Sequence, residues 1–357
     1  MSAFELELLL AAFAGGAFGA AIGALPAFVF TGFLVIAGEV VSILGKALPG
    51  SALGNPDITG AVAFGPAFGP HVAFGGGAAA AAYLARRREL TPEFDYHQAK
   101  AITVGLGTRP DVLLVGGVFG VVGQALFATS DAIGVPWDPV AFGVVASALL
   151  HRVAFGYSLV GAAPGQWLDM TPFERGERRA TTAADGGETA TDGGTPTGRY
   201  AVEPWLPHQY RWANVAALGA VCGVLGAYIA YRTGSAFLAF GVSAASLLFI
   251  VAGVDRIPVT HHMTLPASTV VLAMVPGAAG GVSSATIGAA VPLGHALLAG
   301  ALLGLIGALV GELCQRVFYA HAETHLDPPA ASIVVTSLTL GLLAILDVLP
   351  SAVWIPV

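Results

Sequence analysis

The sequence predicts an all-α polytopic membrane protein of about ten transmembrane helices, arranged as two five-helix repeats. The chain is 55% hydrophobic and only 10% charged, with a mean hydropathy of +0.77. Soluble domains carry about 25% charged residues, so an ordinary soluble fold is excluded. Apolar stretches long enough to cross a bilayer, about 18 residues or more, recur along the chain, and one polar segment divides them into two halves of similar length.

The first half, residues 1–168, is expected to form five spans. It opens with MSAFELELLL, which has two acidic residues and no basic region. A cleavable signal peptide needs such a basic region, so the first apolar stretch is expected to remain as a helix. The expected spans lie near 8–25, 27–45, 58–85, 112–130 and 139–160.

Residues 169–208 form the clearest boundary in the chain. They include ATTAADGGETATDGGTPTGR, which is rich in Gly, Thr and Asp and has no apolar periodicity. This composition predicts a disordered linker. The second half, residues 209–357, again has five expected spans, near 212–231, 235–254, 263–279, 288–312 and 329–349.

The two halves resemble each other. Glycines three or four residues apart occur in the first span of each half, and again in a later span that is followed by an Asp-Pro step. Asp138 and Asp327 in these steps are expected to be helix N-caps with proline at the first helical position. A repeat with an odd number of spans must be inverted relative to its copy, which is the plan of many secondary transporters.

The distribution of basic residues supports this topology. With the N-terminus outside, twelve lie on the cytoplasmic side: Arg86, Arg87, Arg88, Lys100, Arg109, Arg175, Arg178, Arg179, Arg199, Arg211, Arg256 and Arg316. Only Lys46 and Arg232 lie outside, so the bias follows the positive-inside rule. If 58–85 and 263–279 were re-entrant instead of spanning, twelve basic residues would again lie in the cytoplasm and two outside. Both arrangements put the linker in the cytoplasm, but they place the N-terminus on opposite sides of the cell membrane.

One expected span is broken near its middle. Residues 64–77 read FGPAFGPHVAFGGG, with Gly65, Pro66, Gly69 and Pro70 in succession. Proline removes a backbone donor and clashes with the preceding turn, and glycine lets the chain bend. A break inside a membrane is tolerated only against protein or a water-filled cavity.

The corresponding segment of the second half is also short. This segment, residues 261–284, reads HHMTLPASTVVLAMVPGAAGGVSS. Only about a dozen residues around Pro266 form a continuous apolar stretch before Pro276 and Gly277 interrupt it. Breaks at corresponding positions of two repeats indicate a binding site, in which helix ends, together with the hydroxyls of Thr264 and Ser268, contact the ligand. The alternative is that these residues only shape helix packing.

Three further sets of polar residues are candidates. His71 lies at the first break, where it is either a ligand-binding or proton-transferring group or a packed neutral side chain. Asp57 precedes the same helix and either contributes to the site or caps the helix. His321 and His325, four residues apart, have a spacing that can share a metal ion, although ordinary interfacial histidines give the same pattern.

These features predict a transporter or permease for a small solute or ion, with alternating access at the paired breaks. A channel of similar architecture, a membrane scaffold and an intramembrane enzyme are the alternatives. The sequence has no GxxxxGK[ST] or GxSxG motif and no basic-aromatic patch, so no catalysis, cofactor or nucleic-acid partner is expected. The expected partner is the lipid bilayer, and the Gly-rich helices suit self-association into a homo-oligomer.

Overall fold

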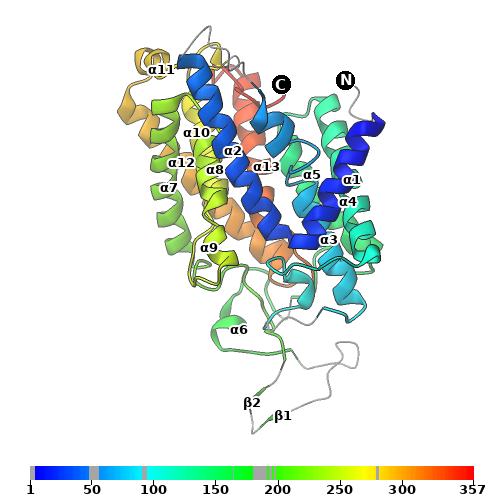
Figure 1. Cartoon of the computed structure of the whole chain (residues 1–357). Helices are drawn as coiled ribbons and strands as arrows, with labels where there is room; N and C mark the ends of the chain where they lie inside the picture. Colours follow the sequence, from blue (N-terminus) through cyan, green and yellow to red (C-terminus); the bar gives the residue numbers. More distant parts are fainter. Residues whose placement is uncertain are drawn as a thin grey trace.

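The protein is a bundle of helices with a small extension at one end (Figure 1). The computed structural model describes residues 5–47, 56–90, 95–163, 165–179, 191–192, 195–196, 198–278 and 281–357. Within these ranges the secondary structure is helical, apart from two-residue strands β1 (Thr191–Asp192) and β2 (Thr195–Pro196), which pair antiparallel.

The helices of the first half follow the expected spans closely. They are α1 (Leu6–Ile22), α2 (Ala24–Ala47), η1 (Thr59–Ala63), α3 (Ala73–Arg86), η2 (Gln98–Lys100), α4 (Pro110–Ile133) and α5 (Pro139–Ala154). The remaining elements are α6 (Thr171–Glu174), α7 (Trp212–Thr233), α8 (Leu238–Ala245), α9 (Leu248–Val251), α10 (His261–Ala273), α11 (Ser284–Ala290), α12 (Leu293–Cys314), η5 (Gln315–Tyr319) and α13 (Pro328–Ile345).

Five helices in the described part of the chain are long and apolar enough to cross a membrane: α2, α4, α7, α12 with η5, and α13. Large apolar side chains such as Leu114, Val221 and Leu298 are exposed on their outer faces, whereas polar side chains such as Gln124 and Thr264 are buried. This distribution suits a protein surrounded by lipid. The all-helical membrane class is therefore supported.

The predicted break in 58–85 is confirmed. η1 ends at Ala63 and α3 begins at Ala73, so nine residues of turns separate them. Polar groups at the break find partners in neighbouring helices, as when the Thr31 hydroxyl of α2 donates to the carbonyl oxygen of Phe68 at 2.7 Å. The second short segment also ends as predicted, because α10 passes through Pro266 and stops at Ala273, before Pro276.

Two expected spans differ from the structure. The span 235–254 is divided into α8 and α9, and at the junction the Ser246 hydroxyl donates to the carbonyl oxygen of Ser243 at 2.7 Å. Such local serine bonds compete with regular helix geometry. The span 288–312 starts too early, since Pro292 forces Val291 into an extended conformation and α12 begins only at Leu293.

The interpretation of 169–208 as a disordered linker is wrong for both of its ends. Met170 and Val202 are buried in one apolar cluster with Tyr210 and Ala320. A composition average over forty residues hid these few apolar anchors. Residues 180–190, 193–194 and 197, in the middle of the segment, lie outside the described residues.

Close helix crossings at glycines hold each half together. α1 packs on α3 and α4, and α7 packs on α10 and α12, while α2 contacts α8 and α5 contacts α13. At the α1–α4 crossing, a Cβ on Gly16 would overlap the carbonyl oxygen of Gly116, and at the α7–α12 crossing one on Gly223 would overlap that of Gly300. Small residues allow such close backbone contact between membrane helices.

Gly16→Ala is therefore expected to lower the free energy of unfolding by about 1–3 kcal/mol, because the added methyl group overpacks the α1–α4 crossing. Gly294→Ala in α12 is the matched control, since a Cβ there meets open space. Thermal unfolding of the purified protein measures the difference. Equal melting temperatures for the two variants would contradict close packing at Gly16.

Candidate functional site

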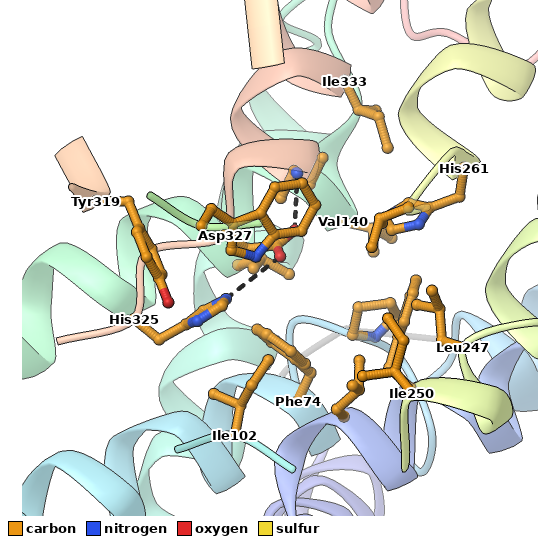
Figure 2. A pocket seen from close by; sticks show the side chains of 18 of the residues that line it. Phe74, Ile102, Val140, Leu247, Ile250, His261, Tyr319, His325, Asp327 and Ile333 are labelled. Atoms are coloured by element: carbon orange, nitrogen blue, oxygen red, sulfur yellow. Dashed lines mark hydrogen bonds and ion pairs between the residues drawn. The ribbon is translucent and has the colours of Figure 1, made fainter. Parts of the chain in front are cut away.

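A cavity of about 810 Å³ lies between the two halves of the chain (Figure 2). Its walls come from α2, α3 and α5 of the first half and from α8, α10 and α13 of the second. The size falls within the roughly 300–1,000 Å³ of typical small-molecule sites. The cavity is the main candidate for a ligand site.

Aromatic rings form much of the cavity wall. Phe28 of α2 and Phe240 of α8 meet edge to face, with their ring centroids 6.0 Å apart. The imidazole of His261, the first residue of α10, lies 4.9 Å from the Phe28 ring and 5.5 Å from the Phe240 ring. His261 points into the cavity in Figure 2, from the side opposite Asp327.

Two carboxylates at the cavity, the buried Asp138 and the partly buried Asp327, cap helices as the sequence predicted. Asp138 accepts a hydrogen bond from the backbone N–H of Val140 at 2.8 Å, at the start of α5. Asp327 accepts one from the backbone N–H of Ala330 at 2.8 Å, at the start of α13. The other oxygen of Asp327 lies 3.4 Å from Nε2 of His325, as Figure 2 also shows. Both aspartates line the cavity in addition to capping.

A buried ion pair closes the cavity on the side of α6. The Lys100 ammonium donates to Oε2 of Glu203 at 2.6 Å and to the carbonyl oxygen of Tyr319 at 2.8 Å. It also lies 4.3 Å from the centre of the Tyr319 ring. The other carboxylate oxygen of Glu203 accepts from Arg199 at 3.3 Å. These contacts connect the first half, the linker and the second half of the chain. The four residues that make them are here called the clasp: Lys100, Arg199, Glu203 and Tyr319.

The clasp is ionic at neutral pH. Burial lowers the pKa of Lys100 to about 8, and the neighbouring Glu203 carboxylate acts in the opposite direction. The ammonium is therefore still mostly protonated at pH 7. Because both side chains are almost completely buried, the attraction between them is weakly screened by solvent.

The first predicted break contributes only part of its residues to the cavity. Pro70 lines it, and Phe74 follows on α3. His71 is fully buried beside them, where its Nε2 is 3.2 Å from Oε1 of Gln124 and its ring stacks on Phe127. Gly69 packs against the His71 ring.

Other residues predicted around the first break lie away from the cavity lining. Gly65 packs against the preceding turn, and Gly15 of α1 lies against the carbonyl oxygen of Pro66. Asp57 is exposed and accepts a hydrogen bond from the backbone N–H of Gly60 at 2.7 Å. Asp57 therefore makes the capping contact that was its alternative interpretation.

The polar residues predicted on α10 mainly connect helices. Thr264 donates to the carbonyl oxygen of His261, and Ser268 donates to that of Gly226 in α7 at 3.1 Å. Pro266 is buried inside the helix, and Gly277 is exposed beyond its end with a φ of +74°. The cavity is lined by the N-terminal turn of α10, through His261 and Leu265.

The two histidines proposed as metal ligands have different partners. Nε2 of His321 lies 3.0 Å from the carbonyl oxygen of Trp167, whereas His325 faces Asp327. Within the described ranges, no group of three or more His, Cys, Asp or Glu side chains is suitably placed to hold a metal ion.

A family model matches residues 1–357 and is described as a family of unknown function, DUF7973. The protein belongs to DUF7973. Neither the curated proteins nor the solved structures gave a match. The function of this DUF7973 protein therefore has to be argued from the cavity itself.

Sequence reasoning missed Lys100, which lines the cavity, and its partner Glu203. Glu203 lay in the segment interpreted as disordered, and Lys100 in a loop of ordinary polarity. One signal was available: Lys100 is one of only two lysines in the chain. Nothing in the sequence indicated its partner, which is 103 positions away.

Lys100→Met is expected to destabilise the protein by about 3–5 kcal/mol, because it leaves the Glu203 carboxylate buried without its closest cation. Glu203→Gln added to Lys100→Met is expected to restore part of this loss. Lys46→Met, at an exposed lysine, is the control and should stay within about 0.5 kcal/mol. Unfolding measurements on the unmodified protein, Lys100→Met, Glu203→Gln and the double variant give the coupling energy, and strictly additive effects would disprove the buried pair.

Proposed function

We propose that this DUF7973 protein is a membrane transporter, built from two inverted five-helix repeats, that binds a small solute in the cavity between them. The observation that carries the proposal is the cavity itself, which residues of both halves line. A site between repeats is where transporters with alternating access bind their substrates.

The helix contacts support the repeat. The helices of the two halves can be matched in order: α1 with α7, α2 with α8, α3 with α10, α4 with α12 and α5 with α13. Under this matching, the helix contacts within the first half correspond to those within the second half. α1 packs on α3 and α4 as α7 packs on α10 and α12, and α4 packs on α5 as α12 packs on α13. The contacts α2–α8 and α5–α13 then join equivalent helices. That is the pattern of two repeats around a pseudo-twofold axis.

Individual residues follow the same equivalence. A Cβ on Gly123 of α4 would overlap the carbonyl oxygen of His71, just before α3. A Cβ on Gly307 of α12 would overlap the carbonyl oxygen of His262, at the start of α10. The same close contact between equivalent helices is strong support for duplication, since the Gly spacing alone is common in membrane helices.

The arrangement of the chain ends favours inverted repeats. The N- and C-termini lie at the same end of the bundle in Figure 1, and the segment that carries α6, β1 and β2 lies at the other. The second half therefore begins at the end of the bundle opposite to the first. The positive-inside bias places the linker end in the cytoplasm.

The short helices α3 and α10 explain how a solute could reach the middle of the membrane. With 14 and 13 residues they are about 20 Å long, less than the roughly 30 Å of the hydrocarbon core. Their N-terminal turns line the cavity through Phe74 and His261. Short buried helices at equivalent positions of two repeats are the features that form transporter sites.

The topology predicts that Val357→Cys is labelled from outside intact cells. The same reagent should reach Gly165→Cys only after permeabilisation, in a background where Cys222 and Cys314 are replaced by alanine. Both positions are exposed. Protection of Val357→Cys in intact cells would favour the arrangement with re-entrant segments, in which both termini are cytoplasmic.

Alternating access predicts that Val140→Cys, on the cavity wall, reacts with a membrane-impermeant thiol reagent applied from either side of proteoliposomes. Reaction from both sides without ionic current supports a transporter. Steady ohmic current through single molecules would indicate a channel. Protection from both sides, with the protein folded, would reject both and favour a membrane scaffold or an intramembrane enzyme.

A further inference from the structure

The charge of the cavity restricts what it can bind. Its lining contains four aspartates and one lysine, with no arginine or glutamate, so the formal charge is 1 − 4 = −3 with neutral histidines. Lys100 is paired with Glu203, which is also paired with Arg199, so these three side chains carry one net positive charge. Asp95 is paired with Arg178 at 2.8 Å. The remaining aspartates of the lining therefore leave the cavity negative.

Asp138, which is buried, and Asp327, which is partly buried, are the members of this set that lie at helix starts. In the described part of the chain, neither forms an ion pair with lysine or arginine. Their backbone amide partners stabilise the carboxylates but do not neutralise them. Under the proposed repeat these two residues are equivalent, since they cap the equivalent helices α5 and α13.

Asp327 is the carboxylate best placed to contact a ligand. Its side chain is 15% exposed, on the cavity wall, and its nearest polar side chain, His325, is at the long distance of 3.4 Å. Burial lowers the pKa of His325, and the neighbouring Asp327 carboxylate opposes this shift. A carboxylate has about four lone-pair sites, and these two contacts leave others available.

Aromatic rings lie beside His325, the polar neighbour of this carboxylate. The rings of Phe74 and Tyr319 lie 5.5 Å and 5.2 Å from the His325 ring, on either side of it. In all, twelve of the lining residues are Phe, Tyr or Trp. The faces of aromatic rings attract cations that have lost their water, and substituted ammonium groups are the usual ligands of such sites.

His261 supplies a second polar group on the opposite wall. It is 4% exposed, and its Nδ1 has no hydrogen-bond partner among the described residues. A buried polar atom without a partner is unusual in native proteins and suggests that a ligand or a rearrangement satisfies it. Its neutral ring can accept a hydrogen bond from a ligand N–H.

We propose that the cavity binds a lipophilic organic monocation, whose positive centre lies against Asp327 and whose apolar body packs on the aromatic walls. This inference rests on the proposed function and names its substrate class. An organic anion of the same size is excluded by the unneutralised carboxylates. A small hydrated metal ion is disfavoured because the walls offer aromatic carbon where such an ion needs several oxygen ligands.

Tetraphenylphosphonium and tetraphenylborate test the proposal, since they have nearly the same shape and opposite charge. Equilibrium binding of each ion is measured on the full chain in nanodiscs of zwitterionic lipid, with empty nanodiscs subtracted. Saturable binding of the cation, at least about tenfold tighter than that of the borate, is expected. Equal binding of the two ions, or tighter binding of the borate, would overturn the proposal.

Asp327→Asn removes the negative charge but keeps the helix cap, because the asparagine side-chain oxygen can still accept a hydrogen bond from the Ala330 amide. It is expected to weaken cation binding at least tenfold, and Asp327→Glu is expected to retain most of it. Asp169→Asn is the matched control, since Asp169 also accepts a helix amide but lies outside the cavity lining. Unchanged cation binding by folded Asp327→Asn would reject the site.

Two outcomes separate this inference from the proposed function. If Val140→Cys reacts from both sides but the cation does not bind, transport stands and the substrate class is wrong. If the cation binds and Val140→Cys is protected from one side throughout, the binding site stands and transport fails. If Asp327→Asn does not fold, the comparison of the two ions on the unmodified protein decides.

Discussion

The burial of α10 along its whole length, and of α3 along nearly all of it, is the constraint on which the rest of the structure depends. Both helices are shorter than the apolar core of a membrane, and a helix end inside that core would expose backbone polar groups that lipid cannot satisfy. Other helices must therefore surround them on all sides. The Gly-lined crossings of α1 with α4 and of α7 with α12 make this possible, because they bring backbone close enough to enclose each short helix.

The cavity follows from the same arrangement. Enclosing two short helices leaves space beyond their N-terminal turns, and the contacts of α2 with α8 and of α5 with α13 border that space. Polar side chains in such a space can stay unneutralised only if a ligand or water reaches them. The aspartates that cap α5 and α13 are thus both structural, through their backbone bonds, and available to a ligand. One aspartate can serve both purposes because capping a helix occupies only some of the hydrogen-bond acceptor sites of its carboxylate.

Tyr319 links the clasp to the proposed binding site. Its carbonyl oxygen and its ring contact Lys100, while the same ring lies 5.2 Å from the ring of His325, the neighbour of Asp327. A ligand that displaces His325 would therefore disturb the contact between Tyr319 and Lys100. The clasp thus joins three separate segments of the chain next to the cavity.

The sequence by itself determined the membrane class, the break at 64–72, the end of α10 and the two Asp-Pro helix starts. These features depend on local physics: apolar length, the missing amide of proline and side-chain caps act within a few residues. Only the tertiary structure decided which polar residues meet. His71, chosen as a functional residue from its position at the break, packs against Gln124, while Lys100 and Glu203, from a loop and a supposed linker, form the clasp. Such contacts depend on how distant segments fold together, and no local pattern encodes them.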